Sequence, residues 1–162
     1  MAQNVYNTMF SLKGEKNICG VRLMPMNKAT TKLVENVRTL VDNSRTHTVV
    51  CDLPTAKGGD DTGPTALELA IMALSDCAAT IFADVAKNSK IDVQKLEVVA
   101  EAEKPADSPK LNSVKLKVNV SSKARKQLIE AIWRRTEANC PVVAIFKDSI
   151  PVEVELSAET VE

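Results

Sequence analysis

Aromatic side chains are nearly absent from this sequence. They make up 3% of its 162 residues, whereas 44% of the residues are hydrophobic, so the core is expected to be aliphatic. The aromatic platform on which single-stranded nucleic acid stacks is missing. An excess of charge is missing too, because 21 basic residues balance 21 acidic ones. We therefore expect neither a nucleic acid nor an anionic membrane as a partner.

Metal-binding motifs are also lacking. The four cysteines form no C-x-x-C pair, and His47 is the one histidine in the sequence. A structural zinc site needs four such ligands at short spacing, so we expect no metal and no cofactor. His47 lies in a predicted strand without a visible Ser or Cys partner, which favours a structural or surface role over that of a base.

Targeting and membrane-spanning segments are not expected. Residues 1–8 have neither a basic region nor an apolar run, and no uncharged stretch approaches the roughly 20 residues that span a bilayer. We expect a cytoplasmic protein, in which the four cysteines stay reduced. The length suits a single domain over residues 1–162, with residues 1–30 as first strands or a poorly packed leader.

The longest apolar run predicts a helix. Gly63-Pro64 breaks the preceding chain, Thr65 and Glu68 fit a capping box, and Asn88-Ser-Lys90 is a plausible end. Between them, Ala66–Val85 is apolar on nearly all faces, which is typical of a helix buried on all sides. A chain of this length cannot sheathe such a helix with one layer, so we expect an obligate homodimer.

Alternation with period two predicts strands on both sides of this helix. Val93–Ala102 and Ser113–Val120 alternate between aliphatic and charged residues and form a predicted hairpin. The segment Lys32–Val41 is ambiguous, because some of its apolar residues keep helical spacing while others alternate. We favour a strand from Val37 that pairs with Thr46–Cys51.

A second helix is predicted from a cap at Ser121 or Ser122 to about Asn139, where Pro141 should end it. Val142–Phe146 and Pro151–Leu156 are predicted as final strands. The order of elements indicates an α+β fold with an antiparallel sheet.

Two cysteines in unlike settings are the candidate chemistry. Cys77 lies midway along the apolar helix, and Cys140 lies at the break before Pro141. Such a pair suits a nucleophile, which an oxidant converts to a sulfenic acid, and a second thiol that condenses with it to a disulfide. The alternative is that both are buried small hydrophobes, which is common for free cysteine. Cys19 and Cys51 lack a helical or corner context and are expected to be non-catalytic.

A reactive Cys77 would need help from a cation. It lies about three turns into its helix, where the helix dipole has faded, and aliphatic surroundings would raise its pKa. Arg22, Arg38 and Arg45 are the candidates, with Arg38 or Arg45 preferred, although any one of them could be a solvated surface charge. Two acidic residues have simpler interpretations: Glu68 as a cap, rather than a catalytic group, and Asp76 as an exposed residue.

Several motifs of the sequence, taken together, resemble those of a known family. The segment Gly58-Gly59 to Cys77 is similar to the Gly-Gly…Gly-Pro-x-x-x-Glu-Leu…Ala-Leu-x-x-Cys signature of the OsmC/Ohr proteins, the osmotically inducible and organic hydroperoxide resistance proteins. Cys140-Pro141-Val142 matches the second cysteine of that family, and Ile91-Asp-Val93 before a strand also fits. The resemblance covers roughly residues 37–156.

The resemblance implies an intertwined α+β homodimer in which sheets of both chains sheathe two long central helices. It implies that Cys77 is the thiol that attacks the peroxide and that Cys140 is the resolving thiol. The implied substrates are organic hydroperoxides or hydrogen peroxide, with electrons supplied by a dithiol.

Two departures from the family pattern bear on activity. In the peroxide-reducing branches of the family a glutamate follows Asn-Pro and holds the arginine, whereas this sequence has Gly63-Pro64 and its matching position is Leu67, one residue before Glu68. The family arginine has no unambiguous match. The chain is therefore placed nearer the OsmC-like branch. The hypotheses are a thiol-dependent hydroperoxide reductase and a non-catalytic protein that senses oxidants or holds an apolar ligand at the dimer seam.

Overall fold

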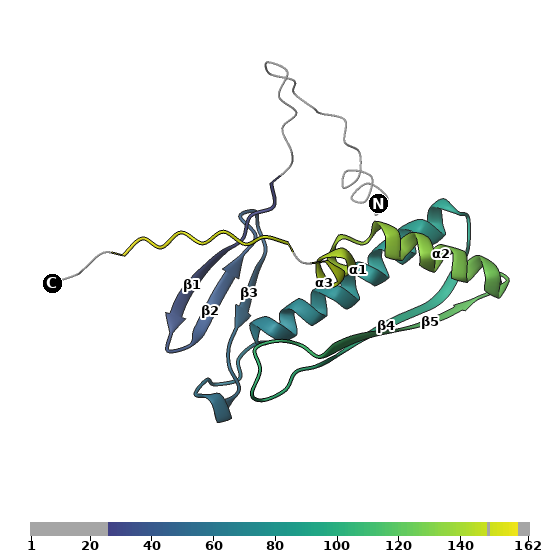
Figure 1. The fold of residues 1–162 in the computed structure, drawn as a ribbon. Coiled ribbons are helices and arrows are strands. Elements are labelled where there is room, and N and C mark those ends of the chain that lie inside the picture. Colours follow the sequence, from purple (N-terminus) through teal and green to yellow (C-terminus); the bar gives the residue numbers. More distant parts are fainter. Residues whose placement is uncertain (1–25, 149, 159–162) are drawn as a thin grey trace, which may run out of the picture.

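The structure is a computed structural model that describes residues 26–148 and 150–158. Its elements combine two antiparallel sheets with three helices, so the predicted α+β class is confirmed (Figure 1). In chain order they are β1 (Thr30–Glu35), β2 (Arg38–Asp42), β3 (Thr48–Cys51), the 3-10 turn η1 (Thr55–Lys57), α1 (Ala66–Asn88), β4 (Val93–Glu103), β5 (Ser113–Ser122), α2 (Lys126–Asn139) and α3 (Pro141–Lys147).

The first sheet has the strand order β1-β2-β3, and all of its pairs are antiparallel. The predicted pairing of the strand after Val37 with Thr46–Cys51 is confirmed, with Thr39 opposite Cys51. The alternation of residues in the sequence did not predict β1. This strand pairs with β2, with Leu33 opposite Thr39, and the register of the pairing shifts between Leu33 and Glu35. This sheet carries Arg38 and ends at Cys51, directly before the loop that leads into α1.

The second sheet is the predicted hairpin of β4 and β5, with Val98 opposite Val118. Its valines and leucines are partly buried except for Val99, which is exposed among the charged residues of the outer face. There Lys117 Nζ lies 2.5 Å from Glu101 Oε1. The alternation of aliphatic and charged residues therefore gives the hairpin one apolar face, which packs toward the helices.

Helix α1 lies between the β4–β5 hairpin and the helices α2 and α3 (Figure 1). Its capping box is present as predicted, because the Thr65 N–H donates to Glu68 Oε2 at 2.7 Å and the Glu68 N–H donates to Thr65 Oγ1 at 3.2 Å. The residues buried on α1 form one stripe: Leu74, Ala78, Phe82 and Ala86. Other apolar positions are exposed in the single chain, including Met72 at 54%.

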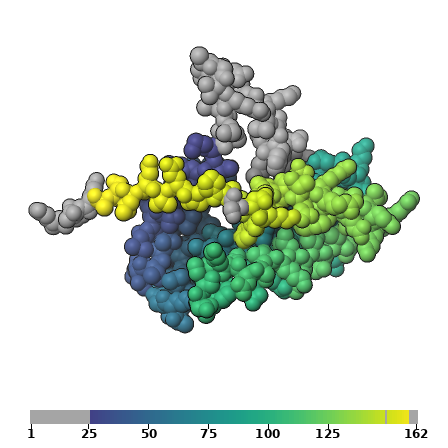
Figure 2. Space-filling model, viewed as in Figure 1, coloured from purple at the N-terminus to yellow at the C-terminus, as the bar shows by residue number. Residues whose placement is uncertain are grey.

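Two predicted elements after Cys140 are wrong. Val142–Phe146 is not a strand but part of α3, because Pro141 occupies the first position of a helix, where its fixed φ and missing N–H are favourable. Pro151–Leu156 is irregular coil, and Val152 and Leu156 are 79% and 90% exposed. Figure 2 shows this segment in yellow, extending away from the helices.

The predicted start of the second helix is also wrong. Ser121 and Ser122 belong to β5 instead, and α2 begins at Lys126 with Arg125 as the N-cap residue. The strand continues because Ser121 still pairs with Lys95 across the hairpin.

By length and composition alone, α1 is apolar enough to cross a membrane. The core helices of soluble proteins meet the same criterion, so this is weak support for a span. Four charged residues interrupt the helix: Glu68, Asp76, Asp84 and Lys87.

Candidate functional site

The two candidate thiols meet in space although 63 residues separate them in the chain. The Cys140 thiol donates a hydrogen bond to Cys77 Sγ across 3.1 Å. A disulfide bond is about 2.05 Å long, so the sulfurs need to approach by only about 1 Å to be joined. The structure therefore brings together Cys77 and Cys140, as the sequence analysis expected.

The break between α2 and α3 positions Cys140. Its backbone is extended, with φ −84° and ψ 108°, which is the conformation that a following proline favours. The chain thus turns between two helices at Cys140, and α3 begins at Pro141. This turn directs the thiol toward α1, where Cys77 lies.

An apolar cluster surrounds the thiol pair. Leu74, Cys140 and Val143 are its buried members, and Cys77 is one of the partly buried residues packed against it. The others of that kind are Ile81, Ala100, Val114, Leu116, Val142 and Phe146. Apolar side chains therefore surround the pair, and they come from α1, α3 and both strands of the hairpin.

Burial raises the pKa of the Cys77 thiol, and the hydrogen bond with Cys140 acts in the same direction. The backbone N–H of Val142 lowers it, while the negative charge of Asp76 raises it. Across residues 26–148 and 150–158, no hydrogen bond or ion pair joins an arginine or a lysine to Cys77. The thiol of a single chain is therefore held mainly in its neutral form.

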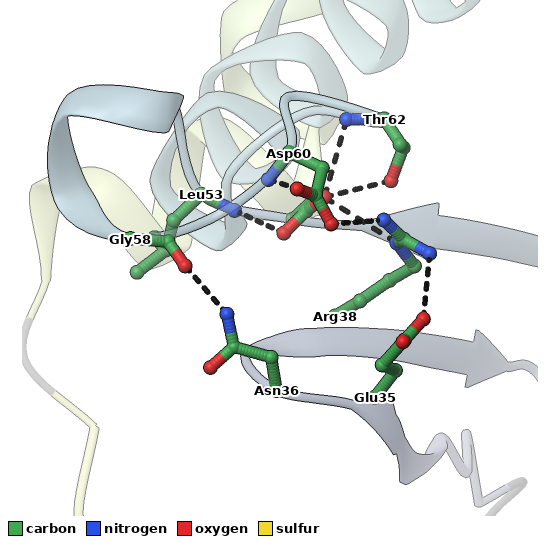
Figure 3. A network of polar contacts seen from close by, with 8 residues as sticks. Glu35, Asn36, Arg38, Leu53, Gly58, Asp60 and Thr62 are labelled. Carbon is green, nitrogen blue, oxygen red and sulfur yellow. Dashed lines mark hydrogen bonds and ion pairs between the residues drawn. The ribbon is translucent and has the colours of Figure 1, made fainter.

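Arg38, the preferred cation, is bound elsewhere. Its guanidinium makes ion pairs with three carboxylates, which belong to Asp60 at 2.6 Å, Glu35 at 3.3 Å and Asp52 at 3.4 Å (Figure 3). This arrangement ties β2 to the loop before α1. Arg45 lies in the turn between β2 and β3, where its backbone N–H donates to Asn43 Oδ1.

Asp52 is a residue that the sequence analysis missed. Its side chain is 1% exposed, and its Oδ2 accepts hydrogen bonds from the Asp60 N–H, the Thr62 N–H and the Thr62 hydroxyl. Oδ1 accepts from the Leu53 N–H at 2.8 Å. Both oxygens act only as acceptors, and the donors are mostly backbone groups. Backbone donors leave no side-chain pattern, so the role of Asp52 could not be predicted from the sequence.

These hydrogen bonds hold the pKa of Asp52 well below its ordinary value of 3.8. The Thr62 hydroxyl has the largest effect, and the three backbone N–H groups add to it against the opposing effect of burial. The charged carboxylate therefore organises the loop from Leu53 to Thr62 (Figure 3). Asn36 adds a further tie, since its Nδ2 donates to the Gly58 carbonyl at 2.6 Å.

Gly63 lets this loop lie directly on β3. A Cβ at this position would lie 2.2 Å from the Val50 carbonyl oxygen, closer than any side chain could be. The close approach also places the Pro64 carbonyl 3.3 Å from the Asp52 N–H, which donates to it. A glycine at position 63 is thus required by the packing of this chain.

Glu68 is engaged in the capping box of α1. The Thr65 N–H and the Thr65 hydroxyl lower its pKa. Glu68 also lines an open cavity of about 700 Å³ at the start of α1, together with Leu67, Ile71 and Met72. The predicted cap is confirmed, and a catalytic role for Glu68 stays a prediction.

The remaining candidates lie apart from the thiol pair. Cys51 is buried at the end of β3. His47 is exposed, with its Nδ1 3.3 Å from Asn43 Nδ2. Cys19 and Arg22 lie outside the described residues. Within the part of the chain that the structure describes, no three His, Cys, Asp or Glu side chains are grouped so that they could hold a metal ion.

Solved structures share this architecture. An OsmC-like protein from Mycoplasma pneumoniae superposes with a TM-score of 0.69 at 14% identity, over 78% of this chain and 91% of the other. An organic hydroperoxide resistance protein from Elizabethkingia anophelis gives 0.62 at 16% identity, over 80% and 93%. The organic hydroperoxide resistance protein OsmC from Legionella pneumophila gives 0.55 at 18%, over 76% and 90%. At such identities the likeness shows the fold alone.

The long apolar helix α1, the hairpin beside it and the helices α2 and α3 together form an OsmC-like fold. The family model for OsmC-like proteins matches residues 58–155, which is more than half of the sequence. The chain therefore belongs to the OsmC-like protein family, and the resemblance seen in the sequence is confirmed. No curated protein matches the chain in sequence.

The acceptor role of Asp52 predicts how stability depends on pH. Because its pKa is lowered on folding from 3.8, ionised Asp52 stabilises the folded state above that value, and the stabilisation is lost as the pH falls further. In Asp52→Asn, the amide NH₂ would face N–H donors. We expect this variant to be less stable at pH 7, with a smaller loss of stability between about pH 5 and pH 3 than the wild type.

Urea unfolding at a series of pH values measures this dependence. Asp107→Asn is the matched control, because Asp107 is an exposed residue of the β4–β5 loop, and its curve should follow the wild type. Identical pH dependence of the wild type and Asp52→Asn would contradict the role of the buried carboxylate.

Proposed function

We propose that this protein is a thiol-dependent peroxidase that reduces organic hydroperoxides or hydrogen peroxide. Cys77 is the attacking thiol, and Cys140 is the resolving thiol. The distance of 3.1 Å between the two sulfurs is the observation that carries the proposal. The names of the Legionella and Elizabethkingia proteins, which refer to organic hydroperoxide resistance, favour the same chemistry.

In the first step the Cys77 thiolate attacks the terminal oxygen of the hydroperoxide. A sulfur–oxygen bond forms, the oxygen–oxygen bond breaks, and the alkoxide leaves and takes up a proton as an alcohol. Cys77 becomes a sulfenic acid, so the sulfur is oxidised by two electrons and the peroxide is reduced. Cys77 is suited to this step because it is the partly exposed member of the pair.

In the second step the Cys140 sulfur attacks the sulfenic sulfur of Cys77. The disulfide forms and the hydroxyl group leaves as water. The corner before Pro141 needs little movement for this, since the thiols already share a hydrogen bond. A dithiol then returns both cysteines to thiols and is itself oxidised to a disulfide.

The first step requires the thiolate form of Cys77, and burial opposes the ionisation of this thiol. A cation therefore has to approach Cys77, and the predicted source is Arg38 or Arg45 of a second copy of the chain. Arginine suits the task because it stays charged when partly buried and can orient a peroxide oxygen. Arg38 would have to leave some of its three carboxylates to do so.

A non-catalytic function is the second candidate. It is favoured by Leu67 in place of the family glutamate and by the engagement of Arg38 with acidic residues. The open cavity beside Leu67, Ile71 and Met72 offers an apolar surface to a ligand. In this alternative the thiols sense oxidants without turnover, or the fold binds an apolar molecule.

Turnover separates the two functions. With tert-butyl hydroperoxide as substrate and dithiothreitol as reductant, the wild type should consume peroxide repeatedly, whereas Cys77→Ser should fall to the rate without protein. Cys51→Ser is the matched control, because it removes a buried thiol outside the pair and should keep the activity. Equal peroxide consumption by the wild type and Cys77→Ser would exclude the peroxidase.

We further propose an obligate, intertwined homodimer as the functional unit. The single chain leaves Met72 of α1 and Leu33, Val34 and Val50 of the first sheet exposed. Exposed apolar side chains on a helix and a sheet are expected where a second copy packs. The exposed coil Pro151–Leu156 is consistent with segments that a second copy covers. A single domain over residues 1–162 and a cytoplasmic location stay predictions.

Light scattering at micromolar concentration tests the homodimer. The wild type should have about twice the chain mass of 17.6 kDa. Met72→Lys places a charge on the apolar face of α1 and should dissociate or destabilise the dimer. The control Asn119→Lys adds the same charge on the outer face of the hairpin and should stay dimeric. A stable folded wild-type monomer would contradict the proposal.

A further inference from the structure

The two thiols of the site differ in exposure to solvent. Cys140 is 1% exposed, inside the cluster with Leu74 and Val143. Cys77 is partly exposed, because it lies at the edge of the buried stripe of α1. Its helical neighbours on the other side, Ala73 and Thr80, are small and exposed.

We propose that the reductant of this site attacks the Cys77 sulfur of the disulfide and expels Cys140 as the leaving thiolate. The inference rests on the proposed function, since it concerns the return of the oxidised pair to thiols. Thiol–disulfide exchange depends on which sulfur a thiolate can reach, and Cys77 is the more exposed of the two sulfurs in the described chain.

The exchange balances with a dithiol as the reductant. One thiolate of the dithiol bonds to Cys77 Sγ, the sulfur–sulfur bond of the protein breaks, and its electron pair goes to Cys140, which takes up a proton. The second thiol of the reductant then attacks the reductant's own sulfur in the mixed disulfide. Cys77 leaves as a thiolate, and the reductant ends as a cyclic disulfide that has lost two electrons.

Attack in the opposite direction, on the Cys140 sulfur, would be unfavourable. The incoming thiolate would have to enter the apolar cluster to reach Cys140, which removes its charge from water. The difference in access therefore favours attack at Cys77.

Site-resolved mass spectrometry tests which sulfur is attacked. The full-length protein is oxidised with diamide, treated briefly with excess glutathione, quenched in acid and labelled with N-ethylmaleimide in denaturant. We expect glutathione on Cys77 and maleimide on Cys140, exceeding the reverse pattern by at least about tenfold. Glutathione recovered mainly on Cys140 would overturn the proposal.

A second measurement is independent of the disulfide. Reduced Cys140→Ser and Cys77→Ser are treated with 4,4′-dithiodipyridine, and labelling of the remaining thiol of the pair is followed by peptide analysis. Cys77 should react at least about tenfold faster than Cys140 in the folded proteins, and guanidinium should abolish the difference. Equal rates in the folded proteins would overturn the proposal.

These outcomes are distinguishable from failure of the peroxidase itself. A protein that turns over hydroperoxide but carries glutathione on Cys140 refutes only the direction of reduction. A protein in which Cys77 is the reactive thiol but hydroperoxide is not consumed supports the accessibility of Cys77 and refutes the proposed function.

Discussion

The contact between the start of α3 and the middle of α1 is the constraint on which the site depends. Pro141 keeps Cys140 extended and begins a new helix, so the chain turns sharply at the thiol. Val143 then packs with Leu74 in one buried cluster. Since α1 is held by its capping box and by the hairpin, the position of Cys140 follows from this packing. A local backbone rule thus brings together two cysteines that lie far apart in the chain.

The same packing limits the reactivity of Cys77. Apolar surroundings that hold the sulfurs together also raise the pKa of Cys77, which lowers the fraction of reactive thiolate. Arg38, which could offset this, is held by carboxylates that organise the loop before α1. Geometry therefore favours disulfide formation, while burial opposes the thiolate that the proposed reaction needs.

The sequence predicted the elements that have a strong local signal. The capping box of Thr65 and Glu68 and the alternation of β4 and β5 depend on neighbouring residues, and both were found. Short apolar runs were ambiguous: Val142–Phe146 is helical because tertiary packing decides such a run. Asp52 was missed because most of its hydrogen-bond donors are backbone N–H groups, which leave no side-chain pattern in the sequence. Cys77 and Cys140 were singled out by their settings in a helix and before a proline, and the family resemblance implied their separate roles. No spacing rule relates residues so far apart.

The most direct test of the account is the product of a single oxidation. The reduced protein receives one equivalent of tert-butyl hydroperoxide, and non-reducing digestion with mass spectrometry locates the linked cysteines. The account predicts a cross-link between Cys77 and Cys140, with Cys19 and Cys51 recovered as thiols. Recovery of Cys77 as an unmodified thiol, without a linked peptide, would contradict the redox pair and leave both cysteines as residues of the core.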